Sequence, residues 1–297
     1  MPAAGPPERS QVRPEPQSRL KLAPLLEATI HSDHAGPPLQ LFSARGYEWV
    51  TAQLPIVNLP AELDGFRILH LSDLHVRPKW DAVYDNLIQR IRAAPLDLIV
   101  FTGDFVENKH NFRGEIPVLR RFFAGLVSRL GTVAILGNHD GDLLGLPLAN
   151  MNLTRIDHQR LSLHSGSATV ELIGIAGVER EDFDPVFLRS LGPKSEASVR
   201  ILLSHYPDLI RKTAFLEADL FLTGHTHGGQ VCLPGKIPIL RHDSLPRKFI
   251  GGINRFYDTW LVVNRGLGFS SLPIRLFCPA EVVEIVLRKA GASSAVI

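Results

Sequence analysis

Five short apolar runs in this chain each end in side chains that are suited to binding a metal ion. Residues 66–71, for example, lead into Asp73 and His75, and residues 96–101 lead into Asp104. Apolar runs of this length, bounded by turn residues, are typical of buried strands. Ligands in α/β proteins bind beyond the carboxyl ends of such strands. The five clusters contain Asp73 with His75, Asp104, Asn138 with His139 and Asp140, His205, and His225 with His227.

The cluster at residues 223–230 is the most suggestive of the five. His225 and His227 stand one residue apart and are followed by two glycines, after the apolar residues 218–222. Imidazole is the commonest protein ligand for metals, and glycines allow a sharp turn around an ion. Taken alone, such a short motif is better explained by a solvated turn. The other four clusters make the metal-site interpretation the stronger one.

The spacing of apolar residues predicts alternating strands and helices. Helical spacing covers residues 81–92, 116–130 and 185–191, and residues 39–56 alternate as a hairpin would. The expected fold is α/β: a four-layer α/β/β/α sandwich of two packed mixed sheets flanked by helices. Further strands are expected at residues 66–71, 96–101, 133–136, 162–164, 169–175, 199–203, 220–222, 259–263 and 282–287.

Composition is that of an ordinary globular protein, with 45% hydrophobic and 21% charged residues. Residues 1–37 are rich in proline and are expected to form a flexible tail, because they cannot bury enough apolar surface. Residues 38–290 are expected to form a single domain, followed by a C-terminal tail at 291–297.

The charge balance gives no sign of a nucleic-acid partner, since 32 basic residues stand against 30 acidic ones. The two cysteines, Cys232 and Cys278, are expected to be reduced thiols in a reducing compartment, and a disulfide between them is the alternative. No stretch reaches the ~20 apolar residues that span a bilayer, and the start of the chain lacks a secretory pattern. The expectation is a cytoplasmic protein, with peripheral contact to a membrane as a further hypothesis.

The five clusters occur in the order D-x-H, G-D, G-N-H-[DE], H and G-H-x-H, and this order resembles the calcineurin-like metallophosphoesterase superfamily. The resemblance covers about residues 50–288. It extends to a bacterial phosphodiesterase branch marked by S-D-L-H at 72–75, G-H-T-H-G-G-Q at 224–230 and R-G-L-G at 265–268. One departure is Glu107, where relatives often have aspartate. That position supports a ligand in the family and does not bind metal itself.

The resemblance implies a centre of two divalent metal ions, such as manganese, iron, zinc or cobalt. It also implies that His139 protonates the leaving oxygen, that Asp140 holds His139 in position, and that a metal-bound hydroxide attacks phosphorus. By the same resemblance the first ion takes Asp73, His75 and His227, the second takes Asn138, His205 and His225, and Asp104 bridges them.

The expected activity is hydrolysis of a phosphodiester or pyrophosphate, with a monoesterase, a nuclease, a protein phosphatase or a non-catalytic scaffold as alternatives. His110 and His242 lie in polar loops where they could contact substrate. The branch includes enzymes that cleave UDP-diacylglucosamine, so a lipid-linked substrate and a transient membrane contact are hypotheses. The apolar residues of loop 266–274 either form an exposed landing surface for such a substrate or cap the sheet. No protein partner is inferred.

Overall fold

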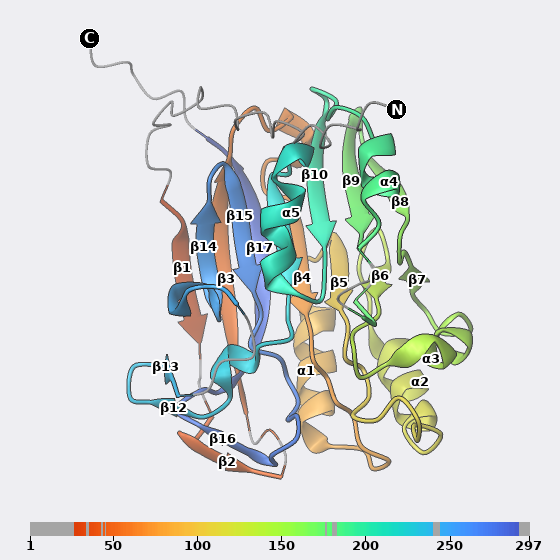
Figure 1. Cartoon of the computed structure of the whole chain (residues 1–297), viewed down its shortest axis with the longest axis vertical. Helices are drawn as coiled ribbons and strands as arrows, with labels where there is room; N and C mark the ends of the chain where they lie inside the picture. Colours follow the sequence, from red (N-terminus) through yellow and green to blue (C-terminus); the bar gives the residue numbers. More distant parts are fainter. Residues whose placement is uncertain are drawn as a thin grey trace, which may run out of the picture.

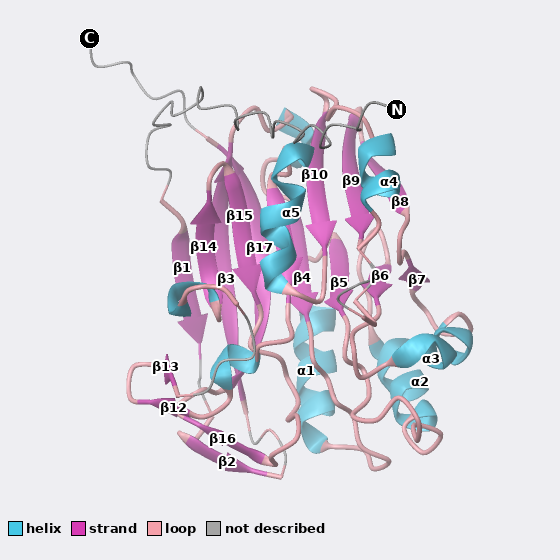
Figure 2. Cartoon of the chain, viewed as in Figure 1, coloured by secondary structure: helices cyan, strands magenta, loops and turns pink. Residues whose placement is uncertain are grey.

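Two large β-sheets pack face to face, and helices cover their outer faces (Figures 1 and 2). The computed structural model describes residues 27–33, 36–42, 44, 46–175, 177–179, 183–239 and 244–290. The predicted four-layer α/β/β/α sandwich of mixed sheets is therefore confirmed.

The first sheet is mixed. Strands β4 to β7 are parallel to one another, while β17 runs antiparallel to β4 and parallel to β3. In spatial order its strands are β1 (Thr29–Asp33), β3 (Tyr47–Ile56), β17 (Ala280–Lys289), β4 (Arg67–Leu71), β5 (Leu98–Thr102), β6 (Thr132–Ile135) and β7 (Thr154–Arg155).

The second sheet has a parallel centre and an antiparallel strand at each edge. Its order is β14 (Gly252–Phe256), β15 (Thr259–Val263), β11 (Leu220–Thr223), β10 (Ser198–Leu203), β9 (Ala168–Gly174) and β8 (Arg160–Ser165). Two antiparallel pairs stand apart from these sheets: β2 (Leu39–Leu41) with β16 (Ile274–Leu276), and β12 (Cys232–Leu233) with β13 (Ile237–Pro238).

Alternating side chains on the central strands explain the four layers. On β4, Ile68 packs between the two sheets while Leu69 packs under the helices of the first sheet. Successive strand residues point to opposite faces, so a strand with both faces buried is apolar throughout. The helices are α1 (Ala82–Ala93), α2 (Ile116–Gly125) and α3 (Gly141–Leu148) beside the first sheet, and α4 (Pro185–Ser190) and α5 (Ile210–Thr213) beside the second.

Three expectations for individual elements were wrong. The tail interpretation fails for residues 29–33, which form β1 and pair with β3. The hairpin at 39–56 does not exist, because β2 pairs with β16 and β3 pairs with β1 and β17. The second helix ends at Gly125, five residues early, since the backbone of Arg129 and Leu130 bonds to the carbonyls that precede β5. Residues 1–26 and 291–297 lie outside the described residues.

Candidate metal centre

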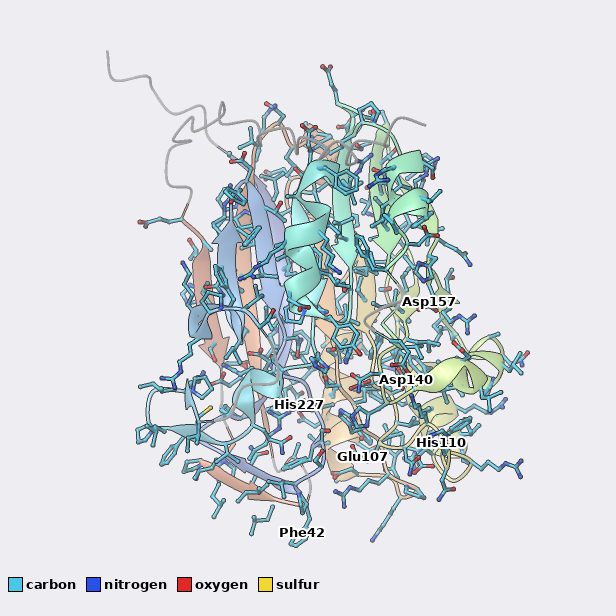
Figure 3. The ribbon with its side chains drawn as sticks, viewed as in Figure 1. Phe42, Glu107, His110, Asp140, Asp157 and His227 are labelled. Carbon is cyan, nitrogen blue, oxygen red and sulfur yellow. The ribbon has the colours of Figure 1, made fainter. Side chains whose placement is uncertain are left out.

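The five predicted clusters meet at one end of the sandwich, where the central strands of both sheets end (Figures 1 and 3). Parallel strands place their carboxyl ends at the same edge of a sheet. Strands β4, β5 and β6 bring Asp73, His75, Asp104 and Asn138 from the first sheet. Strands β10 and β11 bring His205, His225 and His227 from the second. All seven expected ligands are thus within one small region.

Asp73, His75 and His227 form one compact group that is shielded from solvent. The Nε2 atoms of His75 and His227 are 3.1 Å apart, and Asp73 Oδ1 is 3.2 Å from His227 Nε2. Asp73 Oδ1 also lies 4.0 Å from His75 Nε2. These atoms face a common point, so the group could hold a metal ion.

Asn138, His205 and His225 form a second group beside the first. Asn138 Oδ1 lies 3.0 Å from both His205 Nε2 and His225 Nδ1, and those two nitrogens are 3.3 Å apart. Two imidazole nitrogens and one amide oxygen form a set of donor atoms that suits a transition metal. His225 presents Nδ1 where the other three histidines of the site present Nε2.

Asp104 lies between the two groups. Its Oδ2 atom is 3.5 Å from His75 Nε2 in one group and 3.2 Å from His205 Nε2 in the other. Ligands bound at about 2.0–2.2 Å on adjacent corners of a coordination shell are about 3 Å from each other. Apart from the 4.0 Å between Asp73 Oδ1 and His75 Nε2, the spacings in both groups are close to this value, so the side chains present fit metal ions.

Burial and mutual charge set the protonation of these side chains. Burial opposes ionisation of Asp73 and Asp104, but the neighbouring imidazoles hold the pKa of both carboxyls well below the usual range. Burial, with the charge of His205, lowers the pKa of His225 to about 3, and burial lowers the pKa of His227 to about 4. Both of these rings are therefore neutral at physiological pH, the form that binds metal.

Five residues in the ligand loops have a strained backbone. Asp73, His75, Asp104, His225 and His227 all have φ between +39° and +69°. Residues other than glycine rarely adopt this region, and each one costs about 1–3 kcal/mol. Such strain persists where the surrounding structure enforces it, most often at functional sites. These five are expected metal ligands, although nine other non-glycine residues of the described chain also have positive φ.

Gly224 lets the loop after β11 approach Asp73. A Cβ placed on Gly224 would collide with Ser72 Oγ and Asp73 Oδ2. We therefore expect Gly224→Ala to displace Asp73 and to weaken metal affinity about 10–100-fold, the range seen when support of a ligand is lost. Titration calorimetry of the metal-free protein measures this. Gly251→Ala is the matched control, because its Cβ would make only ordinary contacts of 3.4 Å or more. Equal affinities in the two variants would contradict the prediction.

The Asp140 carboxylate bonds to backbone N–H groups, while the His139 ring bonds to the Glu107 carbonyl, so the expected role of Asp140 in positioning His139 stays a prediction. Its two carboxylate oxygens accept hydrogen bonds from the backbone N–H groups of Asp104, Phe105, Val106 and Gly137 at 2.7–3.2 Å. Burial and the charge of Asp104 raise the pKa of Asp140 to about 7. The role of Asp140 is to tie the loop after β5 to the loop after β6.

His139 is held by backbone atoms. Its Nδ1 donates to the carbonyl oxygen of Glu107 at 2.6 Å, and its own N–H donates to Asp104 Oδ1 at 2.9 Å. The ring is half-buried and meets the ring of His75 edge-on at 5.0 Å. Because Nδ1 carries the bonded hydrogen, Nε2 is the atom that can take up or release a proton.

Glu107 links three parts of the site. Its carboxylate lies 2.8 Å from His75 Nδ1 and accepts the backbone N–H of Ser271 at 3.0 Å, while its carbonyl holds His139. The resemblance of the sequence motifs to the family implied that the residue at this position supports a metal ligand. The contact with Ser271 was not predictable, because the two residues are far apart in sequence and no local pattern links them.

A cavity of about 290 Å³ opens beside Asp104, His139, His225 and His227. Its wall includes Leu272, which is exposed, while Leu267 and Phe269 of the same loop are buried in the core under the first sheet. Loop 266–274 is therefore divided: part of it packs inside, and its tip borders the cavity. Of the two interpretations left open for this loop, Phe269 fits the one in which the loop caps the sheet, because it is buried and its ring packs against the guanidinium of Arg275.

The structure does not place the two expected substrate histidines in this cavity. His110 is exposed in the loop after β5 and does not line it (Figure 3). His242 lies outside the described residues. Their role as substrate contacts stays a prediction.

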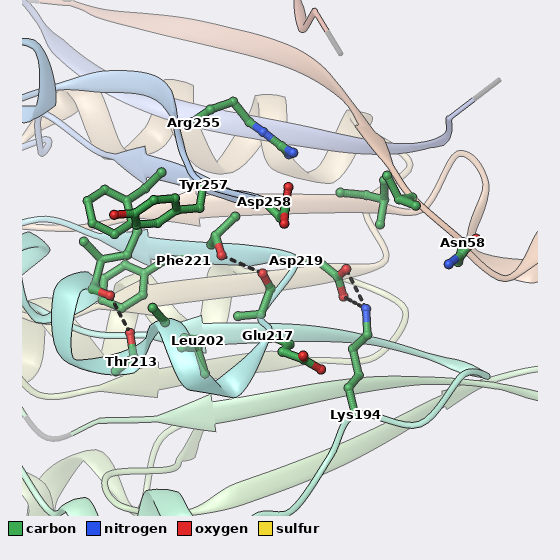
Figure 4. A pocket seen from close by; sticks show the side chains of 17 residues that line it. Asn58, Lys194, Leu202, Thr213, Glu217, Asp219, Phe221, Arg255, Tyr257 and Asp258 are labelled. Atoms are coloured by element: carbon green, nitrogen blue, oxygen red, sulfur yellow. Dashed lines mark hydrogen bonds and ion pairs between the residues drawn. The ribbon is translucent and has the colours of Figure 1, made fainter. Parts of the chain in front are cut away.

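A larger cavity, of about 660 Å³, lies elsewhere (Figure 4). Its wall includes Asp219 before β11 and Asp258 before β15, so it lies toward the opposite ends of these strands from the ligand loops. Lys194 donates to both carboxylate oxygens of Asp219 at 2.7 and 2.8 Å, which neutralises much of its charge. No histidine lines this cavity among the described residues, so the chemistry belongs to the smaller one.

The fold is a sandwich of two mixed sheets, and the loops at the strand ends bring together imidazoles, carboxylates and an amide. This arrangement defines a class of metal-dependent hydrolases. The chain belongs to the calcineurin-like phosphoesterase family, because residues 66–229 match the sequence profile of that family. Members use divalent metal ions, and the protein is a hydrolase of phosphoester bonds.

Similar proteins support this assignment. The uncharacterized metallophosphoesterase YkuE of Bacillus subtilis is 32% identical over 241 residues, covering 77% of this chain and 82% of the relative. The phosphodiesterase YaeI of Escherichia coli is 30% identical over 237 residues, covering 75% and 82%. The UDP-2,3-diacylglucosamine pyrophosphatase LpxG of Chlamydia trachomatis is 28% identical over 290 residues, covering 76% and 85%.

Proposed function

We propose that this protein hydrolyses a phosphodiester or pyrophosphate bond with two divalent metal ions. The observation that carries the proposal is the position of Asp104 Oδ2, within 3.5 Å of a histidine nitrogen in each ligand group. One carboxylate placed in this way serves two ions, as in two-metal hydrolytic sites. Asp73, His75 and His227 would hold the first ion, and Asn138, His205 and His225 the second.

The bound ions would supply Lewis acidity toward water and toward the phosphoryl oxygens. The remaining chemistry falls to residues of the chain. His139 faces the cavity with Nε2 free and Nδ1 fixed to the Glu107 carbonyl, so it is placed to protonate the leaving oxygen. Asp140 keeps the loops that carry Asp104 and His139 in register.

A diester or pyrophosphate substrate is favoured over a monoester by two considerations. The cavity extends past the ligands to Val231, Ser270 and Leu272, so it has room for a group on the far side of phosphorus. One relative bears the name phosphodiesterase and another the name pyrophosphatase. A lipid-linked nucleotide-sugar is the proposed substrate class, supported by the name of LpxG and by the exposed Leu272 at the edge of the cavity.

Chelation tests the proposal. We expect overnight treatment with a chelator, followed by desalting, to reduce hydrolysis of an aryl phosphodiester by at least about 10²-fold, because a lost metal removes several kcal/mol of stabilisation. Adding back manganese, iron, zinc or cobalt, one at a time, should restore activity and reveal the preferred ion. The same series with an aryl monoester measures the expected preference for diesters. Full activity in protein shown by elemental analysis to be metal-free would contradict the proposal.

Among the described residues, no helix is both long and apolar enough to cross a membrane. A cytoplasmic location, with the protein at most peripheral to a membrane, remains a proposal. It is tested by fractionating cells that express the protein and assaying each fraction for it.

A further inference from the structure

The small sheet formed by β2 and β16 is inverted relative to an ordinary surface sheet. Gln40 pairs with Arg275 in its centre, and both are almost fully buried. Leu39 and Leu41, on either side of Gln40, are exposed. An antiparallel sheet with one face in water normally turns apolar residues inward and polar residues outward. Here the apolar residues face outward.

The pair β12 and β13 also turns apolar residues outward. Cys232 is buried, whereas Leu233 is 52% exposed and its partner Ile237 is 48% exposed. The two small sheets are joined, since Val231 forms a bridge with Leu276 of β16. They lie below the large sheets in Figure 1, at the same end as the ligand loops. We call the outward residues the apolar rim: Leu39, Leu41, Phe42, Leu233, Ile237, Ile239 and Leu272.

The polar residues beneath the rim have partners in the protein. Arg275 donates through Nε to the Gly268 carbonyl at 2.9 Å and through Nη2 to the Arg265 carbonyl at 2.7 Å. Gln40 donates to the Gly46 carbonyl at 3.2 Å. A buried guanidinium needs such acceptors, and these carbonyls supply them. The inverted sheet is therefore anchored from inside, which fixes its apolar side outward.

The outermost residue of the rim is Phe42. It is 64% exposed and points away from the body of the protein at the lower tip of the molecule (Figure 3). Its backbone N–H donates to the Pro273 carbonyl at 2.8 Å, so its position is fixed by the loop that borders the cavity. A group of exposed apolar side chains of this kind marks a site of interaction.

We propose that the apolar rim docks on the surface of an anionic lipid bilayer. Residues 39–42, 231–239 and 270–276, which build the rim, contain no carboxylate, but Arg275 is buried and Lys236 is paired with Glu48. The exposed cations beside the rim are Arg77 and Lys79, which share a groove of about 420 Å³ with Phe42 and with Asp81. Apolar side chains that enter the acyl boundary, bordered by cations that meet lipid phosphates, are the features of a peripheral membrane surface.

The composition of the rim favours a bilayer over a protein. Protein interfaces are enriched in aromatic residues, methionine and arginine at their centres. The rim consists of six aliphatic residues and one phenylalanine. A second copy of the chain is the alternative occupant, and the test below distinguishes it.

Docking at the rim would bring a lipid-linked phosphoester to the metal centre, a consequence that rests on the proposed function. Leu272 belongs both to the rim and to the cavity that contains Asp104 and His139. An acyl chain could stay in the bilayer while its phosphate enters the cavity. The reacting group would not have to leave the membrane surface completely.

Vesicle flotation of the full-length protein tests the docking surface. We expect the wild type to float with vesicles of phosphatidylcholine and phosphatidylglycerol, and less with phosphatidylcholine alone. Phe42→Ser combined with Ile237→Ser should reduce the bound fraction at least about tenfold, because two apolar side chains no longer leave water. The control is Val186→Ser on α4, a position 74% exposed but outside the rim, which should bind as the wild type does. Neither variant should alter hydrolysis of a soluble aryl phosphodiester.

Three results would overturn the inference: no flotation of the wild type, equal flotation of the double variant, or a wild-type dimer that the double variant dissociates. The last result would assign the rim to a second copy of the chain. Vesicle binding in a protein that hydrolyses no phosphoester would overturn the proposed function and leave the docking surface standing.

Discussion

Asp104→Asn is expected to abolish hydrolysis and to release bound metal. Asp104 Oδ2 approaches histidines of both ligand groups, at 3.5 and 3.2 Å, so the substitution weakens both sites at once. It also removes the negative charge that would hold two cations close together. The loss of several kcal/mol of metal-dependent stabilisation corresponds to a fall in turnover of about 10³-fold or more. Turnover of an aryl phosphodiester and elemental analysis of the purified variant measure the two effects.

Two further variants make this result specific. Asn138→Ala removes a neutral ligand from one group only, so it should do less harm than Asp104→Asn. Asp142→Asn also removes one negative charge near the site, but its side chain is exposed on α3, and its activity should equal that of the wild type. If Asp104→Asn kept full activity and two metals, the assignment of Asp104 as the shared ligand would be wrong.

His139→Ala is expected to lower turnover by about 10²–10⁴-fold on a substrate with an alkoxide leaving group, the range for general acid catalysis. The ring faces the cavity, and its Nδ1 is occupied by the Glu107 carbonyl, which leaves Nε2 to deliver a proton. With nitrophenolate as the leaving group the loss should be much smaller, because that oxygen needs no proton. Turnover numbers for matched alkyl and nitrophenyl diesters give the comparison.

The metal content of the His139 variant is a necessary control, because His139 lies against His75. We expect both ions to be retained, since the ring is proposed to bind neither. His164→Ala removes an exposed histidine of β8, and it should leave both substrates unaffected. Equal losses on the two substrates would instead assign His139 an electrostatic role.

The local elements near the site were largely predictable from the sequence. The helix expected at 81–92 is α1, and it begins where the Asp81 side chain accepts the N–H of Val83. The apolar runs before Asp73, Asp104 and His205 are β4, β5 and β10. In each case the periodicity of the residues and the local capping or turn chemistry agree with the final structure.

Elements that depend on distant partners were not predictable. The inversion of β2 cannot be inferred from residues 39–41, because it follows from Arg275, which lies more than 200 residues away and pairs with Gln40. The end of α2 at Gly125 is also set from outside the helix, by hydrogen bonds to residues that precede β5. Periodicity reports which residues prefer burial, but it does not report which chain segment will bury them.

By itself the sequence determined the class of this protein: its alternating apolar runs require two sheets with buried faces, and the polar groups at their ends are suited to metal ions. Only the tertiary structure decided how those groups act. It turned the Asp140 carboxylate toward four backbone N–H groups and fixed His139 on the Glu107 carbonyl. It also divided loop 266–274 between the core and the rim. The reason is physical: a residue's type sets which bonds it can make, while its partners are set by segments that meet only on folding.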